Sequence, residues 1–424
     1  MTTKILALVL LAAMYVVMIG FARWRMYAVL TVAVLYLITG ILPLSAVLPA
    51  INWNVLMMMA GTMVIVDYFI ESRMPNRIAD LLLDKSKNVM WVTIFMSLFA
   101  GIISAFIDNV ATVLMVAPVG LVICKKLKIS PVPMILSIAV SSNLQGAATL
   151  VGDTTSIMLG AAAKMDFLDF FWMHGRPGIF WAVELGAACT VPIMMFLFRK
   201  NKESVSVKER TPVLDLIPSI MLILMVAALI FASFFKNKPE NTNGFICLTL
   251  ALVTILLDFV SSRNSGHIAR ALLSVDLETL VLLGGMFLVV EGITQAGIIE
   301  DFAGWIVAVG AGNLFLLYTV IVWGSVLISA FVDNIPYVST MLPVIASVSA
   351  GMGIEPYLLF FGLLSGATLG GNLTPVGASA NIAGVGLLKQ NGYEVGFKDF
   401  MRIGVPFTLT AVTVGYLFIW FVWR

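Results

Sequence analysis

The sequence predicts an all-α polytopic membrane protein that is built from two inverted repeats. Of its 424 residues, 60% are hydrophobic and only 11% are charged, whereas a soluble domain carries about 25% charged residues. The phrase Phe-Ile-Asp-Asn at 106–109 recurs as Phe-Val-Asp-Asn at 331–334, and each copy lies inside an apolar run. The two aspartates are 225 residues apart (333 − 108), which indicates two related halves.

The long apolar runs define the crossings, because a helix needs about 20 apolar residues to span a bilayer. Two runs, 133–163 and 357–388, contain Gly, Thr, Asn and Pro near their middles, so each is expected to be a broken helix. The continuous candidates are 4–22, 26–43, 54–71, 177–198, 213–235, 243–260, 277–295 and 402–423.

The stretches 91–124 and 313–349 carry the Asp-Asn phrase at their centres. Each half of such a stretch has about 15 residues, which is short for a full crossing. Both stretches are therefore predicted to be re-entrant helical hairpins with Asp-Asn at the tip. Such a tip is tolerated only when it is buried in protein or faces a wet cavity.

The first repeat is expected to cover residues 1–200 and the second 213–424, joined by a charged cytoplasmic linker at 201–212. Each repeat then contains five crossings and one hairpin. Because five is an odd number, the second repeat must insert upside down relative to the first. This is the inverted-repeat architecture of secondary transporters.

The distribution of basic residues supports this topology, since cytoplasmic loops are enriched in Lys and Arg. We therefore expect ten crossings in a bacterial or archaeal plasma membrane, with both termini outside. In this arrangement 19 of the 25 Lys and Arg residues are cytoplasmic, namely Arg23, Arg25, Arg73, Arg77, Lys85, Lys87, Lys125, Lys126, Lys128, Arg199, Lys200, Lys202, Lys208, Arg210, Arg263, Arg270, Lys389, Lys398 and Arg402.

Both hairpin tips are candidates for a binding site. Asp and Asn commonly cap helix N-termini, and this structural role accounts for part of the pattern. A carboxylate at membrane depth is nevertheless costly and usually functional, so the tips are also expected to line an ion or substrate site. The aspartates would repel a bare anion unless Na⁺ or H⁺ neutralised them. The coupling ion is therefore expected to be Na⁺ or H⁺, with no cofactor and no other metal; the tip residues are Asp108, Asn109, Asp333 and Asn334.

The breaks in the two broken helices supply further oxygen ligands, from freed backbone carbonyls and from polar side chains, that suit Na⁺ or an oxyanion. A packing kink of small residues is the alternative, but breaks at matching positions in both halves favour a site. Asp67 and Glu291 lie within spans and are candidates for a proton relay or for support of the site, with a structural hydrogen bond as the alternative. The candidates at the breaks are Asn143, Thr149, Gly152, Asp153, Thr154, Thr155, Ser156, Asn372, Thr374, Gly377, Ser379 and Asn381.

With the tip phrases and the run 371–381, the chain resembles the ion transporter superfamily over essentially its whole length. The resemblance is to the arsenite-permease and sodium–proton-antiporter branch, which is related to the melanosomal P protein and to the divalent anion–sodium symporters. It implies a homodimer in which each protomer has a scaffold domain and a mobile transport domain that work by an elevator motion. Residues 152–156 look more like the sodium–proton antiporter version, whereas the second half leans towards the arsenite permeases.

The sequence therefore predicts a Na⁺- or H⁺-coupled secondary transporter that moves a small anion or oxyanion, arsenite-like or carboxylate, across the lipid bilayer. A Na⁺/H⁺ antiporter is the main alternative, and an ion channel is a third possibility. The chain has no Gly-x-x-x-x-Gly-Lys-Ser/Thr loop, so energy is expected from an ion gradient or from a separate ATPase subunit. An enzyme is not expected, because His174 and His267 both lie outside the apolar segments. No nucleic-acid partner is expected either.

Overall fold

The computed structural model describes residues 2–84, 86–201, 203, 211–235, 237–262, 269, 271, 273, 275–310 and 312–424. Most of the predicted linker 201–212 therefore lies outside the described residues. So do His267 and several of the basic residues on which the predicted topology depends, namely Lys85, Lys202, Lys208, Arg210, Lys236, Arg263 and Arg270.

The first half is helical apart from one small hairpin. Strands β1 (Trp172–Met173) and β2 (Arg176–Pro177) pair in antiparallel fashion. The helices are α1 (Thr2–Gly20), α2 (Arg25–Ile38), α3 (Val47–Ala50), α4 (Trp53–Glu71), α5 (Met74–Asp84), α6 (Val89–Ser104), α7 (Asn109–Leu127), α8 (Val132–Gly146), α9 (Thr154–Ala162) and α10 (Ile179–Leu197), with short 3-10 turns η1 (Ala22–Trp24), η2 (Leu44–Ala46) and η3 (Phe167–Phe170).

In the second half, the described residues form helices throughout. These are α11 (Ile217–Ala232), α12 (Thr242–Ser262), α14 (Leu277–Gln295), α15 (Ile298–Gly310), α16 (Leu314–Ser329), α17 (Asn334–Met352), α18 (Tyr357–Gly370), the 3-10 turn η4 (Gly371–Leu373), α19 (Ser379–Gln390) and α20 (Phe397–Trp423).

Among the described residues, eight helices are long and apolar enough to cross a membrane, and a ninth arises if α15 and α16 count as one bent span. Six of them, α1, α4, α10, α12, α14 and α20, coincide with predicted continuous spans. The runs 26–43 and 213–235 instead form the shorter helices α2 and α11, of 14 and 16 residues. The other two long helices, α7 and α17, are the second arms of the predicted hairpins and have 19 residues each.

The predicted breaks are present in both halves. Between α8 and α9 the chain leaves the helix at 147–153, and between η4 and α19 it does so at 374–378. The helices α5 and α15 were not predicted, because 11 and 13 residues are too few for a crossing. Each of these two short helices connects a span to the first arm of a hairpin.

The two halves repeat each other closely. Helices α6 and α16 have the same bounds after a shift of 225 residues, and so do α7 and α17. The packing also repeats, since α6 packs on α8 as α16 packs on α18. Helix α4 of the first half packs on α12 of the second, and α2 packs on α14 in the corresponding way. The halves are therefore interleaved rather than separate.

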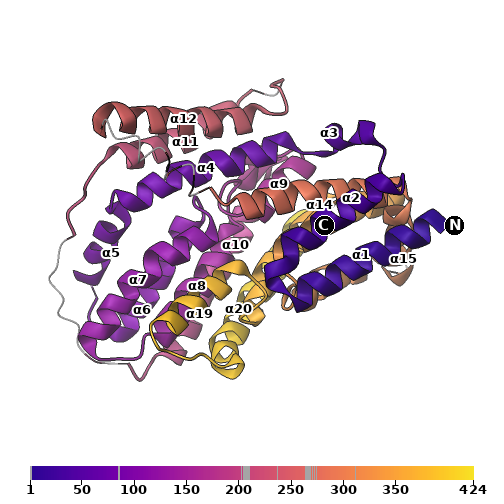
Figure 1. The fold of residues 1–424 in the computed structure, drawn as a ribbon. Coiled ribbons are helices and arrows are strands. Elements are labelled where there is room, and N and C mark those ends of the chain that lie inside the picture. The colour runs from indigo at the N-terminus through magenta and orange to yellow at the C-terminus, as the bar shows by residue number, and fades with distance from the viewer. Residues whose placement is uncertain are drawn as a thin grey trace.

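Figure 1 shows how these pairs are arranged. Helices α11 and α12 lie along α4 at the upper edge of the view, and α1, α2 and α14 form a group at the right. The hairpin arms α6 and α7 pack with α8 and α19 at the lower left. The tips of the hairpins lie between these groups, where the broken helices are interrupted.

Glycine allows each broken helix to approach a hairpin tip closely. A Cβ atom at Gly377 would lie 2.6 Å from the carbonyl oxygens of Gly371 and Ser329 and 2.8 Å from that of Ala330. In the first half, a Cβ atom at Gly152 would meet the three corresponding carbonyl oxygens at 2.6 to 2.7 Å. Real Cβ atoms do not approach backbone oxygens so closely, so both positions require glycine.

We predict that Gly377→Ala destabilises the protein, because the added methyl group can be accommodated only if backbone moves. Overpacking of this kind costs about 1–3 kcal/mol, which should lower the melting temperature in detergent by several degrees. The control is Gly386→Ala in α19, where an added Cβ meets nothing within 4 Å. Equal melting temperatures for the two variants would contradict the close approach.

Candidate ion and substrate site

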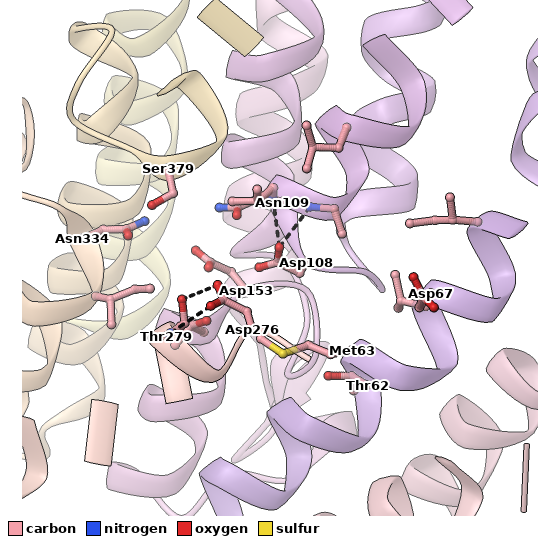
Figure 2. A pocket seen from close by; sticks show the side chains of 17 residues that line it. Thr62, Met63, Asp67, Asp108, Asn109, Asp153, Asp276, Thr279, Asn334 and Ser379 are labelled. Carbon is pink, nitrogen blue, oxygen red and sulfur yellow. Dashed lines mark hydrogen bonds between the residues drawn. The ribbon is translucent and has the colours of Figure 1, made fainter. Parts of the chain in front are cut away.

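A cavity of about 390 Å³ lies where the tips of both hairpins meet the second parts of both broken helices. Helix α4 and the start of α14 close it on another side (Figure 2). Its lining consists of Thr62, Met63, Val66, Asp67, Ile70, Asp108, Asn109, Val110, Ala111, Leu114, Asp153, Thr154, Asp276, Thr279, Asn334, Ile335 and Ser379.

Five helices begin at or beside this cavity: α7, α9, α14, α17 and α19. The residues at their N-caps are Asp108, Asp153, Asp276, Asp333 and Ala378, in that order. A helix N-terminus carries free N–H groups and a partial positive charge. Their convergence favours negative charge here, whether it comes from the aspartates or from a bound anion.

The side chains that line the cavity are acidic and neutral. Four of the described lining residues are aspartates (Asp67, Asp108, Asp153 and Asp276), and none of them is Lys, Arg or His. Figure 2 shows Asp108, Asp153 and Asp276 close together, with Asp67 on the opposite wall. In the part of the chain that the structure describes, no three His, Cys, Asp or Glu residues are placed to hold a metal ion. A cation here would therefore use carboxylates together with amide, hydroxyl and backbone oxygens.

At the first tip, the carboxylate is only half used. Oδ1 of Asp108 accepts the N–H groups of Val110 and Ala111 at 3.0 and 3.1 Å. Its Oδ2 has no hydrogen-bond donor among the described residues. The amide of Asn109 is engaged, because its Nδ2 donates to Oδ1 of Asn143 at 2.9 Å. The first tip therefore offers a carboxylate oxygen to the cavity.

At the second tip, the carboxylate is fully used. Oδ1 of Asp333 accepts the N–H of Ile335 at 3.1 Å. Its Oδ2 accepts from Nη1 of Arg25 and from Oγ of Ser379, each at 2.9 Å. The neighbouring amide is free, since Nδ2 of Asn334 is buried and has no hydrogen-bond partner. Asn334 lines the cavity and is only 3% exposed.

The threonines at the breaks hold the tips in place. Oγ1 of Thr149 donates to the carbonyl oxygen of Ala105, and Oγ1 of Thr374 donates to that of Ala330. Each acceptor belongs to the residue that follows the first arm of a hairpin, where the helix stops. In this structure the two hydroxyls bind backbone, whereas the sequence predicted that they would coordinate the cation or substrate.

A buried amide network ties the two broken helices to each other. Nδ2 of Asn143 donates to the carbonyl oxygen of Thr368 at 2.7 Å and to Oδ1 of Asn372 at 3.1 Å. Nδ2 of Asn372 donates back to the carbonyl oxygen of Val140 at 2.9 Å. Oγ1 of Thr155 lies 2.9 Å from Oγ1 of Thr368. The two broken helices therefore form one rigid support behind the cavity.

The predicted site residues divide into two groups. Glu291 belongs to neither, because it does not line the cavity and its Oε1 accepts from Nε2 of Gln295 at 2.8 Å. The residues on the cavity wall are Asp67, Asp108, Asn109, Asp153, Thr154, Asn334 and Ser379. The residues behind the wall, all buried, are Asn143, Thr149, Gly152, Thr155, Ser156, Asp333, Asn372, Thr374, Gly377 and Asn381.

Two residues of the site were not predicted. Arg25 counted only as a cytoplasmic basic residue, yet its guanidinium reaches Asp333 from the start of α2. Asp276 was matched to Asn52 as the start of a span, and it is in fact an N-cap whose side chain also lines the cavity. The available signal for Asp276 was an acid directly before an apolar run; for Arg25 there was none, because the contact spans 308 residues.

Comparison with known proteins agrees with this architecture. The sequence profile of the citrate transporter family (CitMHS) matches residues 13–366, which is most of the chain. This chain belongs to the citrate transporter family. It is 28% identical to the uncharacterized transporter MT2759 of Mycobacterium tuberculosis over 87% of this chain and 86% of the relative. It is 26% identical to the human P protein over 88% of this chain but only 54% of that protein.

Solved transporters share the fold of this member of the family. The Alcanivorax borkumensis YdaH transporter aligns with a TM-score of 0.61 and 16% identity, over 88% of this chain and 86% of that chain. MtrF of Neisseria gonorrhoeae, from a class of antimetabolite efflux pumps, aligns with a TM-score of 0.56 and 15% identity over 95% and 85%. The family and these neighbours identify the chain as a membrane transporter with several transmembrane helices, and they confirm the predicted superfamily resemblance.

We predict that Asn143→Ala weakens the support behind the cavity, because it removes hydrogen bonds to Asn109, Thr368 and Asn372. The loss should be about 1–3 kcal/mol, since buried polar partners are left unsatisfied, and the melting temperature in detergent should fall. The control is Ser137→Ala on the same helix, whose hydroxyl bonds only the carbonyl oxygen of Pro133 one turn away. A melting temperature for Asn143→Ala as high as that of the control would refute this role.

Proposed function

We propose that this chain is a secondary active transporter, coupled to Na⁺ or H⁺, that moves a small anion or oxyanion by an elevator mechanism. The observation that carries the proposal is a single cavity that combines unpaired acid groups with converging helix N-termini. The carboxylate of Asp108 suits a cation, and the N-termini and the free amide of Asn334 suit an anion. A site of this composition binds the two ions together, which is the requirement for coupling.

The substrate class follows from the family and from the size of the cavity. A volume of about 390 Å³ accommodates a small organic acid or an oxyanion but no large solute. The family description names citrate, so citrate is the first substrate to test and arsenite the second. Neutralisation by a cation is required with either anion, because four aspartates line the cavity.

Two cavities in series support an elevator motion. A second cavity of about 620 Å³ is lined by the first part of α4, including Asn54 and Met58, and by Ile157 and Gly160 of α9. The first cavity is lined by later residues of α4 and by the start of α9. Both cavities therefore lie along the contact between these two helices. Movement of the hairpins and broken helices along α4 would transfer the site from one cavity towards the other.

The inverted orientation of the two repeats, the outside location of both termini and the homodimer belong to the same proposal. The constant shift of 225 residues and the repeated packing of α6–α8 and α16–α18 support a duplication. An odd number of crossings in each half supports the inversion. Side chains such as Ile223, Phe231 and Leu256 are large, apolar and exposed on α11 and α12, where they suit contact with lipid or with a second protomer.

Na⁺/H⁺ antiport is the second candidate function. It is favoured by the absence of Lys, Arg and His among the described residues that line the cavity, since an acid-lined site can alternate between Na⁺ and H⁺ without an anion. The two functions differ in their need for an added solute. Cation–proton exchange without any anion would support antiport.

We predict that Asp108→Asn raises the half-saturating cation concentration by about tenfold or more, because it removes the carboxylate that faces the cavity. The measurement uses proteoliposomes with an internal pH-sensitive dye and imposed Na⁺, Li⁺ or K⁺ gradients, with radiolabelled citrate or arsenite added in separate arms.

The matched control is Asp215→Asn, because Asp215 also accepts the N–H two residues later but is exposed and lies outside the cavity. Cation-dependent uptake of citrate or arsenite would support the proposal. Proton movement with Na⁺ in the absence of either anion would replace it with antiport. No flux in any arm would contradict both.

A further inference from the structure

The two hairpin tips are equivalent in sequence but not in bonding. We infer that in this conformation Arg25 occupies the position of a coupling cation at Asp333, so that the first tip binds the cation and the second tip binds an oxyanion group of the substrate. The inference rests on the proposed function and assigns the two ions of that function to separate ends of one cavity.

The contrast between the tips starts from the carboxylates. Asp108 and Asp333 occupy the same position in the two halves, and each caps the second arm of its hairpin. Asp333 forms an ion pair with Arg25 at 2.9 Å, whereas Asp108 keeps an oxygen without a donor among the described residues. One tip therefore has a built-in counter-ion, and the other requires a mobile one.

The position of Arg25 suits this role. Its side chain is 16% exposed and that of Asp333 is 6% exposed, so water screens the pair only weakly. A guanidinium remains charged at any physiological pH. Nε of Arg25 also donates to the carbonyl oxygen of Met18 at 3.4 Å, which directs the side chain towards the tip. Such a group excludes Na⁺ or H⁺ from Asp333 while the pair exists.

The asparagines show the opposite asymmetry. The amide of Asn109 is engaged with Asn143, whereas Nδ2 of Asn334 is buried, unpaired and part of the cavity lining. In Figure 2 Asn334 and Ser379 lie together on one wall, apart from the three clustered aspartates. These two residues begin α17 and α19, so free backbone N–H groups accompany the amide. Donors without a neighbouring free carboxylate fit a carboxylate or oxyanion oxygen.

Arg25 also links the cation to the conformation. It begins α2, outside the hairpins and broken helices, so the pair exists only while the second tip lies beside α2. When the tip moves away, Asp333 loses its counter-ion and must take one from solution. When the tip returns, Arg25 competes with that cation and promotes its release on this side.

We predict that Arg25→Gln lets the purified protein bind one additional cation per protomer. The measurement is equilibrium binding of radioactive Na⁺ in detergent, with proton uptake from weakly buffered solution as the parallel readout for H⁺. Arg25→Gln with Asp333→Asn should return the count to that of the wild type, because the vacated carboxylate is then gone. Size-exclusion elution and melting temperature establish that each variant is folded.

Two controls accompany this experiment. Arg25→Lys keeps a positive charge and is expected to bind as many cations as the wild type. Arg23→Gln removes an exposed arginine of the same connection and should also leave the count unchanged. An Arg25→Gln variant that binds no more cation than the wild type overturns the inference. A gain that persists in the double variant overturns it as well, because the added cation would not be at Asp333.

The anion end has its own test. Asn334→Ala should raise the half-saturating concentration of citrate, or of arsenite if arsenite is the anion transported, by about tenfold, with no change in the number of cations bound. An unchanged half-saturating concentration would overturn the assignment of the second tip. Failure of the proposed function is distinguishable, since a wild-type protein without anion uptake and without cation binding would contradict that function itself.

Discussion

A helix that stops at membrane depth leaves backbone N–H and C=O groups without partners, and the whole site depends on how this constraint is met. Each hairpin tip is satisfied from two directions. An aspartate accepts N–H groups at the start of the second arm, and a threonine of a broken helix donates to a carbonyl oxygen at the end of the first arm. Glycines at 152 and 377 allow the approach on which the threonine bonds depend. The groups that could bind ions are by-products of this arrangement.

Much of the fold could be predicted because it is written in local patterns. The breaks at 147–153 and 374–378, the capping aspartates and the repeat shift all follow from short motifs. The lengths of α2 and α11 could not be predicted, because an apolar run can continue past the end of its helix. The amphipathic α5 was missed since a search for crossings ignores helices that are too short to cross.

The candidate site was predicted in composition but not in its bonding. Asp108, Asp153 and Asn334 do share one cavity. However, Thr149 and Thr374 serve the backbone, and Glu291 lies elsewhere. These outcomes depend on where a side chain points and on contacts between distant segments, such as that of Arg25 with Asp333. Neither property has a period or a motif, so only the folded chain reveals it.

The ion pair of Arg25 and Asp333 has a consequence for biogenesis. Its two partners are separated by 308 residues, so nearly three quarters of the chain must be synthesised before the pair can form. A charged carboxylate at the bilayer centre costs about 2.5–3.5 kcal/mol on insertion scales, and that cost is unrelieved until α2 and the second tip meet. Membrane quality control would therefore see the second half as incomplete until it has docked on the first, which makes the docking step a checkpoint for correct assembly.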